Sequence, residues 1–165
     1  MWAAVTRTSQ ASPASRQNDK QKASALRVVS IQYTTGAGLC GCDCGGELHV
    51  NPGQATLFIR PALECQRRNP KKYREFKVDA DFSSKHWREL EQLIDHDALF
   101  ALPDKIGCPG CTDGLTEFLE VKFSDHTKKS VFYDGAPKDI LALSQKLSAL
   151  EAKLEQELPA NRPND

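Results

Sequence analysis

The chain contains two groups of short strand-like segments, and a helix-like segment follows each group. The strand-like segments are rich in β-branched and aromatic residues, and several alternate apolar and polar side chains. They comprise residues 26–33, 47–50, 56–59, 76–82, 116–123 and 130–133. The order strands, helix, strands, helix predicts an α+β fold, with an antiparallel sheet of four to six strands and two helices packed on one face.

Two turn sequences join neighbouring strand-like segments into hairpins. In residues 51–54, Asn-Pro-Gly-Gln, proline fixes φ and glycine supplies a positive φ, so the flanking strands are expected to pair. Residues 124–127, Ser-Asp-His-Thr, separate the last two strand-like segments in the same way. Residues 34–38, Thr-Thr-Gly-Ala-Gly, are expected to end the first strand.

Each helix-like segment has recognisable ends and one apolar face. The first starts at Ser83 or Ser84, either of which can cap a helix, and ends before Pro103. The second starts at Pro137, a residue suited to the first helical position, and carries an apolar stripe. The stripe comprises Ile140, Leu143, Leu147, Leu150, Leu154 and Leu158. Because it continues past the expected sheet edge, its end is also a candidate for a weak homodimer contact.

Composition limits the chain to one ordinary folded domain with tails. The 165 residues include 39% hydrophobic and 27% charged side chains, which excludes collagen-like and wholly disordered proteins. Residues 1–24 lack an apolar period and are expected to form a disordered tail. Residues 25–158 are expected to form a single α+β domain, and residues 159–165 a C-terminal tail. No apolar run is long enough to span a bilayer.

The charges balance, with 22 Lys and Arg against 22 Asp and Glu, so no overall field attracts nucleic acid. The one basic cluster surrounds a single aromatic residue, Tyr73. It comprises Arg67, Arg68, Lys71, Lys72 and Arg74. No nucleic-acid motif accompanies this cluster, and a solvated loop is the favoured interpretation. Nucleic acid is therefore not the expected partner, and a protein partner stays open.

Five of the six cysteines lie in two glycine-rich segments, and one stands alone. They are Cys40, Cys42 and Cys44 in the first segment, Cys108 and Cys111 in the second, and the lone Cys65. Disulfides are one interpretation, since Cys108 and Cys111 are close enough in sequence to bond locally, as are Cys40 and Cys44. Such bonds would make both segments rigid.

Two other chemistries stay open for the same residues. Cys40, Cys44, Cys108 and Cys111 can ligate one structural zinc ion as four thiolates, because a Cys-Pro-Gly-Cys turn aims both of its sulfurs to one side. The Cys-x-Cys-x-Cys spacing of the first segment departs from the usual two-residue spacing of zinc ligands. Cys108 and Cys111 can instead act as a redox dithiol, although no helix N-terminus is expected beside them to lower a thiol pKa.

Three parts of the sequence match the pattern of one known family. They are the first cysteine segment, Gly38-Leu39-Cys40-Gly41-Cys42-Asp43-Cys44, the helix-like residues 82–102, and Thr112-Asp113-Gly114. Over residues 27 to 150 the chain resembles an uncharacterised bacterial domain of unknown function, found in predicted secreted and lipoprotein-like proteins. The resemblance implies the same order of elements, places Cys40 and Cys44 in the paired positions and favours a secreted or cell-envelope location. It implies no activity. The first residues carry no signal-peptide pattern, which favours the cytoplasm instead.

These observations favour a non-enzymatic binding or interaction domain whose cysteine-bearing segments form one edge of the sheet. A zinc-binding domain with a four-cysteine site is the first alternative, and a thiol redox protein using Cys108 and Cys111 is the second. The four histidines are scattered without ligand spacing, and no residue is assigned a catalytic role. The only cofactor that the sequence suggests is one structural zinc ion, and none is needed if the cysteines form disulfides.

Overall fold

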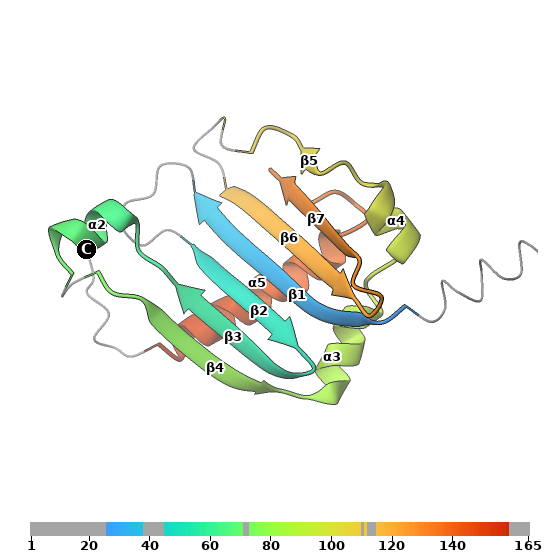
Figure 1. The fold of residues 1–165 in the computed structure, drawn as a ribbon, viewed down its shortest axis with the longest axis horizontal. Helices are drawn as coiled ribbons and strands as arrows, with labels where there is room; N and C mark the ends of the chain where they lie inside the picture. Colours follow the sequence, from blue (N-terminus) through green and yellow to red (C-terminus); the bar gives the residue numbers. More distant parts are fainter. Residues whose placement is uncertain (1–25, 38–44, 71–72, 110, 112–114, 159–165) are drawn as a thin grey trace, which may run out of the picture.

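The computed structural model describes residues 26–37, 45–70, 73–109, 111 and 115–158, which form one sheet of seven strands with four helices (Figure 1). The strands are β1 (Val28–Ala37), β2 (Gly46–Asn51), β3 (Gly53–Ile59), β4 (Phe76–Phe82), β5 (Lys105–Ile106), β6 (Leu115–Phe123) and β7 (Lys128–Tyr133). The helices are α2 (Leu63–Arg68), α3 (Ser84–Glu91), α4 (His96–Ala101) and α5 (Leu141–Gln156). The fold is therefore α+β, as the sequence predicts.

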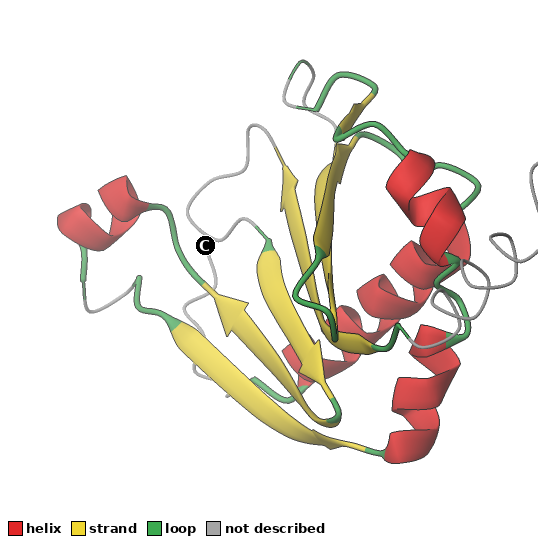
Figure 2. Ribbon diagram, turned by 45° about the vertical axis from the view of Figure 1, so that its right-hand side comes forward, coloured by secondary structure: helices red, strands yellow, loops and turns green. Residues whose placement is uncertain are grey.

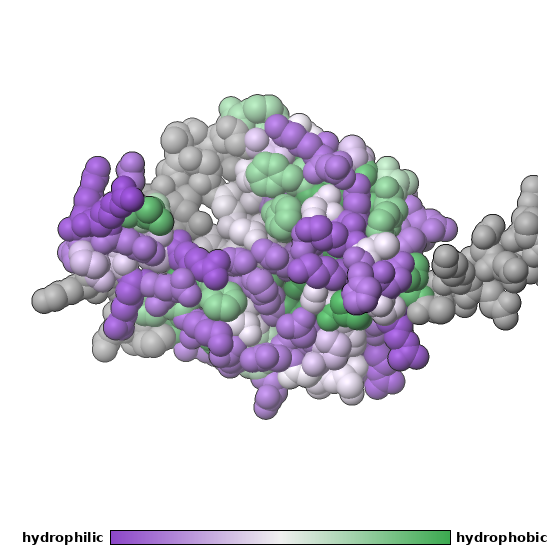
Figure 3. All heavy atoms as spheres, viewed as in Figure 1, coloured by the Kyte–Doolittle hydropathy of each residue, from purple (hydrophilic) through white to green (hydrophobic). Residues whose placement is uncertain are grey.

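The strands lie in the order β4-β3-β2-β1-β6-β7-β5. Every neighbouring pair is antiparallel except β5 and β7, which run parallel. Helix α5 crosses one face of the sheet and contacts β2, β3 and β4 (Figure 2). No described helix lies across the opposite face, which is largely hydrophilic (Figure 3). Within the described residues, no helix combines the length and apolar character needed to cross a membrane.

The core lies between the sheet and α5, and strand alternation places it there. In β2, the side chains of Leu48 and Val50 are fully buried, while those of Glu47 and His49 point to the opposite face. Helix α5 contributes three leucines from the predicted apolar stripe. These are Leu143, Leu147 and Leu154, each at most 1% exposed. These three leucines of the stripe therefore pack within one chain.

The sheet is larger than predicted, because seven strands replace the expected four to six. Strand β1 continues to Ala37 through the Thr-Thr-Gly-Ala sequence that predicts a turn, because β6 pairs with it over its whole length. Strand β5 has only two residues, too few to show any periodicity. Both hairpins form as predicted, with the Gly53 φ at +95° in the first turn.

The helices also differ from the prediction, which has only two. The expected helix from Ser83 to Leu102 is split into α3 and α4, because the Asp95 carboxylate accepts a hydrogen bond from the Ala98 N–H at 3.0 Å and starts a new helix. The short helix α2 includes Arg67 and Arg68 of the basic cluster, for which the sequence predicts a solvated loop. The last helix starts at Leu141 rather than at Pro137.

Candidate functional site

The segments that carry the cysteines are attached at the same end of the sheet. Ala37, the last residue of β1, and Leu115, the first residue of β6, are register partners. The cysteine segment after β1 and the one before β6 therefore adjoin neighbouring points on the sheet. Ile59 at the end of β3 pairs with Gly46 at the start of β2, so β3 ends at this same end of the sheet. Helix α2, which carries Cys65, follows β3 and therefore begins near this end as well.

Cys108 and Cys111 form a disulfide that closes the Cys-Pro-Gly-Cys turn, with Cα atoms 5.3 Å apart. Both residues are exposed, and the Cys111 N–H donates to the Cys108 carbonyl oxygen at 3.0 Å. Cys65 is half-buried and is also disulfide-bonded. The Cys108–Cys111 pair follows a strand and not a helix N-terminus, so no helix dipole favours its thiolate form.

The described residues contain only half of the predicted zinc site. Cys40 and Cys44 lie outside them, and the sulfurs of Cys108 and Cys111 are bonded to each other. No group of three or more His, Cys, Asp or Glu side chains in this part of the chain could hold a metal ion. The four-cysteine zinc site and the redox dithiol stay predictions, as do the tails at residues 1–24 and 159–165, which the structure does not describe.

A buried cluster of polar side chains lies between β1, β6, β7 and α5. The Tyr33 hydroxyl donates to Oε1 of Glu117, and the Ser144 hydroxyl donates to the same oxygen at 2.9 Å. Glu117 is 8% exposed and Tyr33 is fully buried, and burial raises the pKa of Tyr33 far above its usual range. The hydroxyl of Tyr133, also fully buried, has no hydrogen-bond partner among the described residues, although Ser144 lies close to it.

A second buried carboxyl, Glu151 on α5, joins this cluster to the cysteine-bearing end of the sheet. Its Oε1 accepts a hydrogen bond from the Thr35 hydroxyl at 2.7 Å, and Thr35 Oγ1 accepts one from the Gly46 N–H. Burial raises the pKa of Glu151 to about 7, with smaller contributions from the charges of Glu155 and Glu117, while the Thr35 hydrogen bond opposes the shift. Glu151 therefore ties α5 to the end of β1 and the start of β2.

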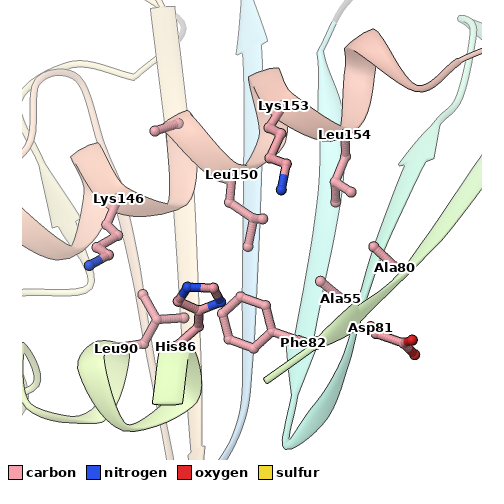
Figure 4. Close-up of a pocket in the computed structure, with 11 residues that line it drawn as sticks. Ala55, Ala80, Asp81, Phe82, His86, Leu90, Lys146, Leu150, Lys153 and Leu154 are labelled. Carbon is pink, nitrogen blue, oxygen red and sulfur yellow. The ribbon is translucent and has the colours of Figure 1, made fainter. Parts of the chain in front are cut away.

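The other side of α5 borders a pocket of about 330 Å³, which lies between α5, α3, β3 and β4 (Figure 4). Small residues on the sheet create it, because Ala55 and Ala80 leave a hollow that longer side chains would fill. Most of its lining residues are apolar. The apolar lining comprises Ala55, Ala80, Phe82, Leu90, Ala149, Leu150 and Leu154. A volume just above 300 Å³ is at the lower end of the range of roughly 300–1,000 Å³ typical of small-molecule pockets.

Helix α3 positions one polar wall of the pocket. The Ser83 hydroxyl caps α3 by accepting from the His86 N–H at 3.3 Å, which places the His86 ring in the first turn of the helix. This ring lies against the Phe82 ring, with centroids 5.8 Å apart. Glu89 of the same helix accepts from Nζ of Lys146 on α5 at 2.8 Å, and this bond lowers the pKa of Glu89. The ion pair joins α3 to α5 beside the pocket.

The other predicted interaction residues lie away from this pocket. Arg67 and Arg68 are exposed on α2, and Arg74 lies over the Phe76 ring at 5.1 Å, while Lys71 and Lys72 fall outside the described residues. The open sheet face carries charges that neutralise one another. Glu120, for example, bonds Lys128 at 3.0 Å and Lys122 at 3.3 Å, and its pKa is lowered although burial opposes its ionisation. The homodimer contact through the last helix stays a prediction.

Sequence reasoning missed both the pocket and the buried carboxyls. Glu151 could have been found, because it stands four residues after Leu147 and three before Leu154, on the same face of the helix. Ala55 and Ala80 offer no such pattern, since two alanines on neighbouring strands become a cavity only when the register is known.

Comparison of the chain with protein families, with curated proteins and with solved structures finds no match.

Proposed function

We propose that the protein is a non-enzymatic binding domain that receives a small apolar ligand in the pocket between α3 and α5. The observation that carries the proposal is a hollow of about 330 Å³ lined mainly by apolar side chains, beside a well-packed core. Pockets of this size and composition commonly serve as ligand sites. The Cys108–Cys111 disulfide is compatible with this function, since it restrains the segment before β6.

The test uses the neutral solvatochromic dye Prodan and one variant that fills the pocket. Ala80 is half-buried on the edge strand β4 and lines the pocket, so Ala80→Phe places an aromatic ring in the space where the dye would lie. Ala142→Phe is the matched control, because Ala142 is exposed on α5 outside the pocket. We expect saturable dye binding by the native protein and by Ala142→Phe, and at least about tenfold weaker binding by Ala80→Phe.

The result is interpretable only if all three proteins fold, which circular dichroism and thermal melting establish. The proposed ligand site is wrong if the native protein does not bind the dye, or if Ala80→Phe binds the dye as tightly as the native protein does.

A further inference from the structure

The charges around the pocket are distributed unevenly. Three lining side chains, His86, Lys146 and Lys153, are basic, and a single one, Asp81, is acidic. Asp81 points away from the other lining side chains, whereas Lys153 extends from α5 toward the space between the helix and the sheet (Figure 4). A ligand in this pocket would therefore lie closer to positive than to negative side chains.

Lys153 differs from Lys146 in having no fixed partner. The Lys146 ammonium is bonded to Glu89 at 2.8 Å, so its charge is already compensated. Lys153 forms no ion pair and no side-chain hydrogen bond with any described residue, although Glu157, at the C-terminal cap of α5, stands four residues later. Its ammonium group is thus available to an anion at the pocket mouth, and two lining leucines, Leu150 and Leu154, flank it on α5.

Building on the proposed binding function, we propose that the pocket takes a small amphiphilic anion, with its anionic head beside Lys153 and its apolar body over Ala55 and Ala80. The apolar body would bury hydrocarbon against the alanine floor, which is the main source of affinity for such ligands. The head group would stay at the open rim, where it forms a charge-assisted hydrogen bond without being fully desolvated. A cationic head group at the same point would meet like charge from Lys153.

The test compares three probes of equal chain length that differ only in head group: octanoate, 1-octanol and octylammonium. Each displaces Prodan from the full chain with its disulfides intact. We expect octanoate to displace the dye at about tenfold lower concentration than 1-octanol, and octylammonium to be the weakest. The advantage of octanoate should shrink as NaCl is raised, because salt screens an exposed charge pair.

The matched variants are Lys153→Met, which keeps an unbranched apolar stem but removes the charge, and Lys138→Met, which removes an exposed lysine outside the pocket. Lys153→Met should weaken octanoate binding about tenfold and leave 1-octanol binding within twofold, while Lys138→Met should change neither. If 1-octanol or octylammonium competes as well as octanoate, or if Lys153→Met affects all probes equally, the anionic ligand is wrong although the pocket binds. If neither the dye nor any probe binds, the proposed function itself is wrong.

Discussion

The two sides of α5 meet the sheet in opposite ways. On the polar side, Ser144 donates a buried hydrogen bond to Glu117 of β6, and Glu151 accepts a part-buried one from Thr35 of β1. On the pocket side, Leu150 and Leu154 face alanines, and space is left over. The difference shows how one helix can serve two purposes. A buried carboxyl requires hydrogen-bond partners at fixed positions, whereas small apolar residues leave a hollow that tolerates a ligand.

The largest expected loss of stability comes from a substitution at Gly45, where two backbone segments on the polar side approach closely. Gly45 has a φ of +88°, and a Cβ added there would lie 1.8 Å from the Thr35 carbonyl oxygen, so the backbone would have to move. We expect Gly45→Ala to lower the free energy of unfolding by roughly 4 kcal/mol. Gly53→Ala is the control, because Gly53 has a similar φ of +95° but no atom within 4 Å of the added Cβ, and should cost only about 1 kcal/mol.

Urea unfolding of the two glycine variants measures the difference directly. Equal losses would mean that backbone conformation alone matters and that the contact between the start of β2 and the end of β1 is not tight.

The next largest expected change in stability concerns the buried carboxyl of Glu151, and this change depends on pH. Because the pKa of Glu151 is raised to about 7 in the folded protein, folding takes up a proton between its ordinary pKa near 4.5 and pH 7. Stability contributed by this group is therefore present at low pH and is lost as the pH rises through 7. Glu151→Gln keeps an oxygen that accepts from Thr35 and removes the charge, so it should stabilise the protein by about 3 kcal/mol at pH 8 and by little at pH 4.5.

Unfolding of Glu151→Gln and of Glu155→Gln at several pH values tests this. Glu155 is exposed on the same helix and serves as the control for the loss of one negative charge. If the free energy of unfolding of Glu151→Gln changes with pH as that of the native protein does, a group other than Glu151 causes the pH dependence.

The same contrast explains which features the sequence could predict. The hairpins and the leucine stripe were predictable, because turn residues and periodicity are local properties. The split at Asp95 was hidden, since the residues before it continue the apolar pattern while a single carboxylate starts a new helix. The buried pair of Tyr33 and Glu117 was beyond local patterns, because 84 positions separate the two residues and only the register of β1 against β6 brings them together.

The smallest effect concerns two tyrosines that line the polar side. Both hydroxyls are buried, but Tyr33 donates to Glu117 whereas Tyr133 has no partner among the described residues. Tyr33→Phe removes a donor from a buried carboxyl and should cost about 2 kcal/mol, while Tyr133→Phe removes only an unpaired hydroxyl and should be neutral or stabilise by up to about 1 kcal/mol. Thermal and urea unfolding of the two variants, which lose the same atom, separate these outcomes. A comparable loss in Tyr133→Phe would mean that its hydroxyl is bonded in solution, for instance to a buried water, and that the polar side is fully satisfied.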